Sequence, residues 1–333
     1  MRHIVFPALA FTALCLATAC QYETLPDSPK NGLRMMTVHA SHADTRTYVS
    51  QKGNKWVSAW DENDKIDLFE LSDDNCSYRV SSECGIDLDA HGKATFTMWF
   101  ADDPLDGYLQ YVGVYPAFNA RVINSSSSGE QWSQAWGSVP ETPRWGFIGN
   151  IHWEQRPAPY SFDPSADLLV SKMTDDVYKQ IDEDTQEIST EISLPFARVG
   201  SIAKITLRGL PEGERLYCGT FSHGRSWQST GDVIYDPVAE KVAVLPAPAT
   251  DKDPFIYFEP AGDVKVDENR EAVIWLRVLS GSLSDHFTIS VETNELYSQE
   301  DNKVYSKTVT LESPITFTEG NITAFAVRLN RVQ

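Results

Sequence analysis

This sequence contains few residues that could act in catalysis or bind a metal, and their spacing matches no catalytic or metal-binding motif. The seven histidines are scattered, no two stand at a metal-ligand spacing, and no Glu is placed as in a zinc protease. Adjacent residues of a strand point to opposite faces, so Asp102 and Asp103 cannot flank one glycosidic bond. The acidic turn at 61–64 lacks the Gly and Glu of a calcium-binding EF-hand, because Ile66 and Ser72 occupy those positions. With no Gly-x-Ser-x-Gly elbow either, the sequence predicts no catalytic residues, no metal site and no cofactor.

Four tryptophans form the densest group of residues that could bind a ligand, namely Trp132, Trp136, Trp145 and Trp153. They lie in a Gly- and Pro-rich stretch that begins with SSSSG at 125–129. Exposed rings here would stack on sugars, or dock a peptide or a partner subunit. Alternatively, a long loop folds back over its domain and the rings complete the core, because a loop of this length must pack its own aromatics to stay ordered. The second arrangement is favoured and the first stays open.

Two cysteines are close enough in sequence to bridge a hairpin. Cys76 and Cys84 flank 77–83, and an oxidising compartment permits a disulfide between them, although both could equally remain free thiols. Cys218 has no sequence neighbour to pair with and is expected to be a buried small hydrophobe.

The N-terminus has the order of a secretory signal. A short charged start is followed by an apolar run at 4–16 and by small residues before Cys20, and polar sequence begins at Gln21. The run is shorter than the ~20 residues of a membrane-spanning helix. The small residues before Cys20 resemble the bacterial lipobox, which implies cleavage after residue 19 and acylation of the Cys20 thiol. An ordinary secretory signal with an incidental Cys is the alternative.

The charge balance limits the partners. The formal net charge is −19, so the chain would repel nucleic acid and anionic membrane and would release no counterions on contact. The sequence therefore predicts no nucleic-acid partner, and attachment to the outer membrane would come from lipid on Cys20. Multiple acyl chains would make that anchor stable.

Period-two alternation of apolar and polar residues dominates the mature chain and predicts an all-β fold. Turn signals separate the expected strands, as in antiparallel β-sandwiches. The expected strands are 65–71, 94–100, 108–115, 167–172, 203–208, 272–279, 287–292, 304–311 and 322–329.

The length suggests two domains of ~150 residues. The acidic stretch 173–187 interrupts the strand rhythm near mid-chain and is the expected boundary. We therefore expect a signal peptide at 1–19, a tether at 20–44 with a strand at 33–39, and β-sandwich domains at 45–180 and 181–333. The alternation of Leu33 and Met35 supports the early strand.

Four segments, read in order, resemble the fimbrillins, the pilus subunits of Bacteroidales that are exported as lipoproteins. The segments are TRT at 45–47 followed by WDENDKI at 60–66, YLQYVGVYP at 108–116, SFDPSADLLV at 161–170, and LPFARVGSIAKI at 194–205. The resemblance implies two transthyretin-like β-sandwiches in tandem, a surface-exposed location on the outer membrane, and assembly by strand donation between subunits.

In that family a protease cuts at an Arg near the N-terminus and removes the first strand, which opens a groove for a donor strand. The matching residue here is Arg46, with Arg34 as second choice; the alternative is that Arg46 is one solvated charge in a loop. Shaft subunits also need a donor segment, and the sequence ends soon after the strand expected at 322–329. Either that strand is the donor, or this subunit is a tip, an anchor or an accessory subunit.

The leading hypothesis is therefore a non-enzymatic, fimbrillin-like surface lipoprotein with a structural or adhesive role in a pilus. Its partners would be other pilus subunits, outer-membrane lipid, and a host protein or glycan. The rival hypothesis, suggested by the tryptophans, is a glycan-binding surface lipoprotein of a nutrient-uptake system.

Overall fold

The structure is a computed structural model, and it describes residues 33–41, 48–52, 55–72, 75–80, 86–89, 93–101, 109–175, 178–180, 186–247, 252–294 and 302–332. Strands dominate these residues, and α1 (Gly129–Trp136) is the one α-helix among them. The predicted all-β class is confirmed. Within the described ranges, no helix has the length and hydropathy to cross a bilayer.

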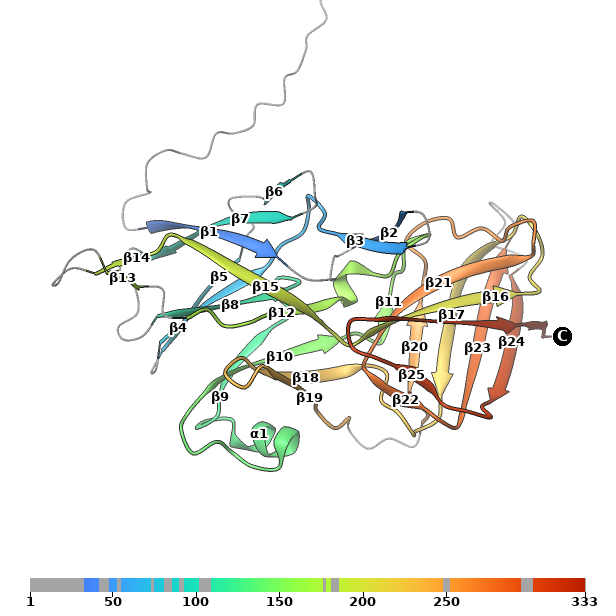
Figure 1. Cartoon of the computed structure of the whole chain (residues 1–333). Helices are drawn as coiled ribbons and strands as arrows, with labels where there is room; N and C mark the ends of the chain where they lie inside the picture. The colour runs from blue at the N-terminus through green and yellow to red at the C-terminus, as the bar shows by residue number, and fades with distance from the viewer. Residues whose placement is uncertain are drawn as a thin grey trace, which may run out of the picture.

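The N-terminal unit is built on an eight-stranded sheet with the order β5-β4-β8-β12-β15-β1-β7-β6 (Figure 1). Its strands are β1 (Leu33–Ser41), β4 (Asp67–Leu71), β5 (Cys76–Val80), β6 (Ile86–Leu88), β7 (Ala94–Ala101), β8 (Gln110–Tyr115), β12 (Leu168–Ser171) and β15 (Glu191–Val199). β15 serves both halves of the sheet. Its residues 191–195 pair in parallel with β1, and 196–199 pair antiparallel with β12. The sheet bends there, so that β1 and β7 pack face to face against β4 and β8 around one core.

A second sheet covers the other face of β4, β8 and β12. It has the order β19-β18-β10-β9, from β9 (Arg121–Asn124), β10 (Trp145–Ile151), β18 (Gly231–Asp236) and β19 (Lys241–Val244). Successive side chains of the middle strands therefore enter two cores: Tyr111 packs toward β1, and Val112 toward β10. Burial on both faces explains why β8 and β12 are nearly continuous apolar runs.

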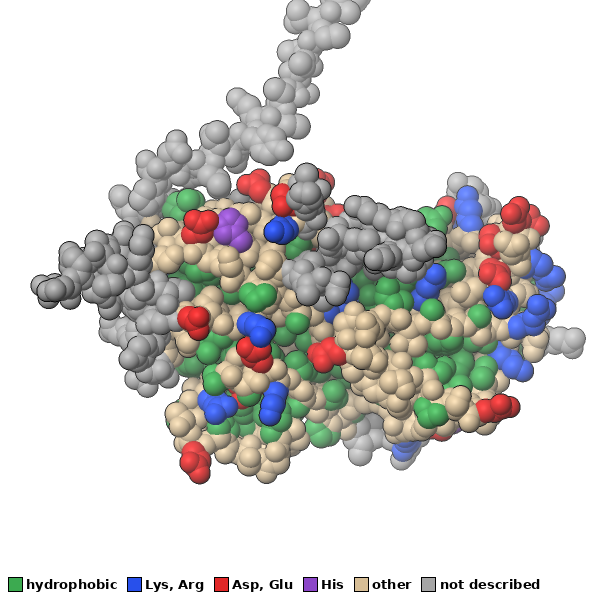
Figure 2. All heavy atoms as spheres, viewed as in Figure 1, with side chains coloured by type: hydrophobic (Ala, Val, Ile, Leu, Met, Phe, Trp, Pro, Cys, Tyr) green, Lys and Arg blue, Asp and Glu red, His purple; other side chains and the backbone are tan. Residues whose placement is uncertain are grey.

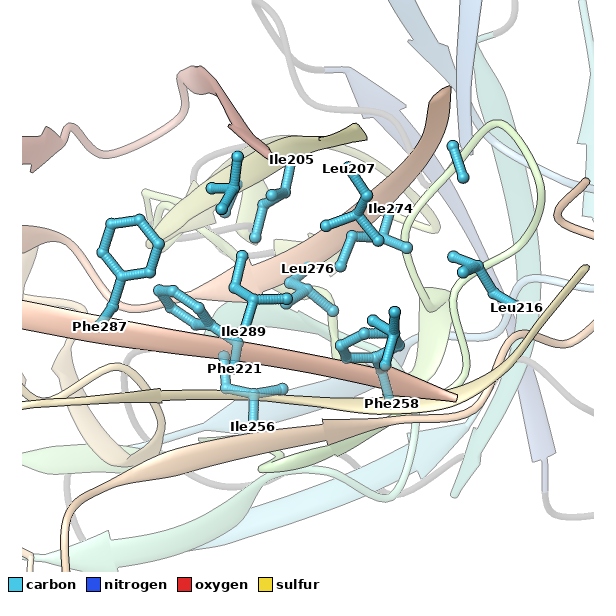
Figure 3. Packing of buried hydrophobic residues seen from close by; sticks show 14 of the residues in the cluster. Ile205, Leu207, Leu216, Phe221, Ile256, Phe258, Ile274, Leu276, Phe287 and Ile289 are labelled. Atoms are coloured by element: carbon cyan, nitrogen blue, oxygen red, sulfur yellow. The ribbon is translucent and has the colours of Figure 1, made fainter. Parts of the chain in front are cut away.

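The C-terminal unit is a sandwich of two sheets. One has the order β21-β16-β26 and the other β11-β20-β17-β23-β24-β27. The strands are β11 (Glu154–Gln155), β16 (Ser201–Arg208), β17 (Arg215–His223), β20 (Phe255–Phe258), β21 (Glu271–Val278), β23 (His286–Asn294), β24 (Lys303–Thr310), β26 (Ile322–Arg328) and β27 (Asn330–Arg331), with the small pair β22 (Gly281–Leu283) and β25 (Ile315–Phe317) beside them. Figure 3 shows their common core, in which Phe221, Phe258 and Phe287 lie among branched side chains such as Ile274 and Ile289.

The change from one unit to the other differs from the predicted boundary at 173–187. That stretch contains the hairpin of β13 (Tyr178–Gln180) and β14 (Gln186–Ile188), and β15 beyond it still belongs to the N-terminal sheet. The chain passes into the C-terminal sandwich at Gly200, between β15 and β16, and later returns to add β18 and β19 to the N-terminal unit. The acidic stretch is thus a connection within one unit, because its flanking strands β12 and β15 pair with each other. The remaining small elements are η2 (Pro164–Ala166) and the pair β2 (Tyr48–Lys52) and β3 (Lys55–Ala59).

Position 200, where the chain passes from one sheet to the other, requires glycine for two reasons, its backbone conformation and the closeness of neighbouring atoms. Its φ is +81°, and a Cβ there would lie 2.4 Å from the carbonyl oxygen of Val278. Left-handed backbone costs ~1–2 kcal/mol for a residue with a side chain, and the clash adds to it. We expect Gly200→Ala to lower the free energy of unfolding by at least ~2 kcal/mol in urea titrations. Gly213→Ala is the matched control, because its φ is +80° with no atom within 4 Å of the added Cβ. Equal losses in the two variants would contradict the role of the Val278 contact.

A buried ionic cluster joins the two units at the same place. Asp167, before β12, lies 2.9 Å from Arg198 Nε on β15 and 2.8 Å from Arg277 Nε on β21. The three side chains are almost completely buried, and both guanidiniums lie within 6 Å of the Phe162 ring. Gln155 adds hydrogen bonds of 2.8 Å to the backbone N–H and carbonyl of Arg277. Burial, opposed by Asp167, lowers the pKa of Arg277 to about 10. The cluster therefore connects β21 of the C-terminal sandwich to β12 and β15 of the N-terminal unit.

Charged side chains of both signs are interspersed over the face shown in Figure 2, with Lys and Arg gathered toward the end of the C-terminal sandwich. The acidic excess of the chain thus forms no single acidic surface on this face. In the described part of the chain, no group of three or more His, Cys, Asp or Glu side chains is placed to hold a metal ion.

Candidate functional site

β1 is inserted between two strands that come from distant parts of the sequence. Eight of its residues pair antiparallel with β7, from Leu33 opposite Ala101 to Ala40 opposite Ala94, and five pair in parallel with β15. The strand predicted at 33–39 is therefore confirmed. Because β1 supplies the pairing partner of both neighbours, its removal would leave one backbone edge of β7 and one of β15 unpaired.

The face of β1 that points into the core does not contain Leu33 and Met35, the alternating pair that suggested the strand. Met36, Val38 and Ala40 are buried, whereas Met35 is 38% exposed. Leu33 and Met35 therefore lie on the face opposite to the buried positions, because successive residues of a strand point to opposite faces. Farther along the strand the local pattern agrees with the structure, since apolar Met36, Val38 and Ala40 alternate with polar Thr37 and His39.

Arg34 occupies the first inward position of β1 and carries a buried charge. It is 8% exposed, it forms an ion pair with Glu70 on β4, and its Nη1 donates to the Tyr111 hydroxyl on β8 at 2.8 Å. The Tyr111 hydroxyl donates in turn to Glu70 Oε2 at 2.7 Å, and the guanidinium lies 5.4 Å from the centre of the Phe100 ring. Burial disfavours the guanidinium charge, but Tyr111 and Glu70 together outweigh it and raise the pKa of Arg34. We name Arg34, Glu70 and Tyr111 the β1 lock.

The burial of Arg34 affects its candidacy as the cleavage residue, for which Arg46 is the first choice. A protease cannot reach Arg34 while β1 is in the sheet, because the residue lies within a paired strand and its side chain is buried. Arg46, the first choice, lies outside the described residues, as does the lipidation residue Cys20. Maturation at Arg46 and acylation of Cys20 stay predictions.

The cysteine pair is described only in part. Cys76 lies on β5 and is half-buried, whereas Cys84 is outside the described residues, so their disulfide stays a prediction. Burial, followed by the nearby charge of Glu70, raises the pKa of the Cys76 thiol to about 12. A free Cys76 would therefore be an unreactive thiol at neutral pH. Cys218 is half-buried on β17 rather than fully buried.

Three of the four tryptophans pack onto the second sheet of the N-terminal unit. Trp132 is 1% exposed and lies 4.7 Å from the Trp136 ring on the same helix, α1. Trp145, on β10, donates from its indole N–H to the carbonyl of Ser72 at 2.8 Å. Trp132 belongs to the core between α1 and this sheet, Trp136 packs partly buried against it, and Trp145 packs partly buried against the core on the other face of the sheet. A contact between these rings and a ligand or partner stays a prediction.

Trp153 is the one exposed ring of the four, and it lines a separate pocket. Its side chain is 52% exposed and its ring centre lies 5.4 Å from that of Phe255, in an edge-to-face arrangement. The pocket has a volume of about 630 Å³, and Trp227, Arg225 and Asp253 also line it. Arg225 Nε lies 3.8 Å from Asp253 Oδ1 at its edge. The pocket thus combines exposed aromatic rings with charged groups of both signs. Of these lining residues, only Trp153 was predicted from the sequence. The others are far from it along the chain, and only the fold brings them together.

The expected donor strand is part of the chain's own C-terminal sandwich. β26 pairs in parallel with β16 from Ile322 to Arg328, and Val327 is buried in the C-terminal core. Donation of this strand to another subunit would require it to leave that core.

No protein-family model and no curated protein matches the sequence. Among solved structures, a candidate cell adhesion protein from Bacteroides uniformis is similar at a TM-score of 0.42 and 12% identity, covering 91% of this chain and 97% of its own. One from Bacteroides fragilis has a TM-score of 0.44 and 12% identity, covering 90% and 97%. The fimbrial anchor protein Mfa2 from Porphyromonas gingivalis has a TM-score of 0.33 and 12% identity, covering 89% and 90%. These structural neighbours are adhesion and fimbrial proteins.

Proposed function

We propose that this protein is a non-enzymatic, fimbrillin-like subunit of a surface pilus, in which β1 is a plug that another subunit's strand replaces. The observation that carries the proposal is the position of β1, which completes both the hydrogen bonding and the core of the N-terminal unit. The four sequence segments that resemble fimbrillins support it. In this proposal the two units correspond to the transthyretin-like sandwiches of that family, and the N-terminal one carries the additional sheet β19-β18-β10-β9.

Replacement of β1 has a direct physical basis. Its loss would expose unpaired N–H and C=O groups of β7 and β15, together with the apolar surface that Met36, Val38 and Ala40 cover. Burial of that surface stabilises by ~25 cal/mol per Å², and main-chain pairing adds to it. An extended segment of another subunit satisfies both requirements. Acylated Cys20 would hold the precursor at the outer membrane until cleavage at Arg46 releases it.

The test is cleavage of the purified protein after Arg46, followed by addition of a shaft subunit of a fimbrillin pilus. Uncut protein is expected to remain monomeric, and cut protein to form a complex that resists SDS. An Arg46→Ala protein treated with the same protease is the control. If no complex forms with cut protein, strand replacement is refuted. If cut protein alone builds long ladders, it is a shaft subunit and β26 is its donor; if it only accepts, it has a tip, anchor or accessory position.

A second candidate function is glycan binding, which the pocket at Trp153 and Phe255 favours. Exposed aromatic rings stack on the apolar faces of sugars, and Arg225 and Asp253 at the edge offer donors and acceptors to hydroxyl groups. A surface lipoprotein of a nutrient-uptake system would need such a site.

Removal of the Trp153 ring should weaken glycan binding by about tenfold or more, since exposed aromatics at the centre of a site dominate its affinity. The measurement is a glycan-array screen of the wild-type protein, followed by calorimetric titration of Trp153→Ala with any glycan that binds. Tyr160→Ala is the control, because Tyr160 is 79% exposed and does not line the pocket. A screen with no glycan bound, or equal affinity in both variants, would count against this function.

A further inference from the structure

The inward face of β1 carries one charged side chain among apolar ones. From the start of the strand, its inward residues are Arg34, Met36, Val38 and Ala40, all buried. A strand that only filled an apolar groove would need no buried guanidinium, and burying a charge is unfavourable unless it is paired. The buried guanidinium on β1 therefore needs a partner of opposite charge in the groove that β1 occupies.

The side chains that pair with the Arg34 guanidinium belong to strands that would remain in the protein after β1 is removed. Glu70 is on β4 and Tyr111 is on β8, in the middle layer of the N-terminal unit, and they are 2% and 0% exposed. Loss of β1 removes the guanidinium from the Glu70 carboxylate at the bottom of the groove. An incoming strand with an apolar side chain at that position would bury the carboxylate without this cation, which is costly in a protein interior.

The shape of the contact favours arginine over lysine. Nη1 of Arg34 donates to the Tyr111 hydroxyl while Nη2 contacts Glu70, and the planar guanidinium lies near the face of Phe100. A single ammonium group cannot reproduce this fork of two nitrogen donors together with the contact to the Phe100 ring.

We propose that the groove beneath β1 selects its donor by charge: it accepts a strand of another pilus subunit that carries Arg at the Arg34 position, followed by apolar or small residues at every second position. The inference rests on the proposed replacement of β1 and adds to it a recognition rule set by Glu70 and Tyr111. β1 itself, with RMMTVHA at 34–40, is the template for this pattern. Subunits whose donor lacks the Arg are rejected, which orders assembly.

The test measures exchange of β1 against labelled peptides. The mature chain receives a specific protease site within 42–47, is cut there, and is titrated with fluorescent peptides of sequence 33–41 by anisotropy. We expect the wild-type peptide to bind, the Arg34→Met peptide to bind roughly a hundredfold more weakly or worse, and the Arg34→Lys peptide to lie between. A Met35→Ser peptide is the control, because Met35 faces outward, and it should bind like the wild-type peptide.

The reciprocal change is made in the protein. Glu70→Met should reverse the preference, so that the Arg34→Met peptide binds at least as well as the wild-type peptide. Glu70→Gln retains hydrogen-bonding groups and should reduce the difference in affinity between the wild-type and Arg34→Met peptides. It replaces Glu70→Met in the test if circular dichroism shows that Glu70→Met does not fold. Equal binding of all peptides by the wild-type protein would overturn charge selection while leaving strand replacement intact. Failure of every peptide to bind, the wild-type one included, would overturn the replacement of β1 and the inference with it.

Discussion

Replacing Asp167 with Ala is expected to lower the free energy of unfolding by about 3–5 kcal/mol. Asp167 is the carboxylate that both Arg198 and Arg277 contact, and all three side chains are almost completely buried. Its removal leaves two guanidiniums of like charge close together without the carboxylate between them. Urea titration followed by tryptophan fluorescence gives the change in stability.

The variant also tests whether this cluster couples the two units, because Arg277 belongs to the C-terminal sandwich and Asp167 to the N-terminal unit. We expect the single unfolding transition of the wild type to separate into two in Asp167→Ala. Glu271→Ala is the matched control, since it removes a partly exposed ion pair with Arg208 of 2.7 Å and should cost less than ~1 kcal/mol. A loss in Asp167→Ala as small as that of the control would refute the importance of the cluster.

Asp67→Asn is expected to stabilise the protein at pH 8 by up to about 4 kcal/mol and to have little effect at pH 4. Asp67 is 1% exposed and its Oδ2 accepts one backbone hydrogen bond, from Phe118 at 2.8 Å. Burial, only partly offset by this hydrogen bond, raises the pKa of Asp67 from 3.8 to about 7. Each pKa unit corresponds to about 1.4 kcal/mol, which sets the expected size.

The raised pKa of Asp67 sets the direction in which the stability difference between wild type and Asp67→Asn changes with pH. The contribution of Asp67 to stability is fully present below the pKa of the unfolded chain, near 4, and is lost as the pH rises through about 7. Urea titrations of wild type and Asp67→Asn from pH 4 to pH 8.5 should therefore diverge as the pH increases. Asp87→Asn, at an exposed position of β6, should show no such divergence. Parallel stability curves for wild type and Asp67→Asn would contradict the raised pKa.

The functional features were accessible from the sequence to different degrees. The lipobox-like segment before Cys20 and the strand at 33–39 are local patterns, and a single pass along the chain finds them. The β1 lock is not local, because Arg34, Glu70 and Tyr111 are ordinary residues until three strands bring them together. The pocket at Trp153 likewise depends on Phe255, which β20 places beside it.

By itself, the sequence determined that this chain is all-β, and where most of its strands lie, because period-two alternation is a property of neighbouring residues. Only the tertiary structure decided that the sheet continues past 173–187 to Gly200, and that β4, β8 and β12 are buried on both faces. These outcomes depend on which strands pair and in what register. The energy that selects them comes from contacts between residues far apart in the chain, such as Asp167 with Arg277, and no local pattern records such contacts.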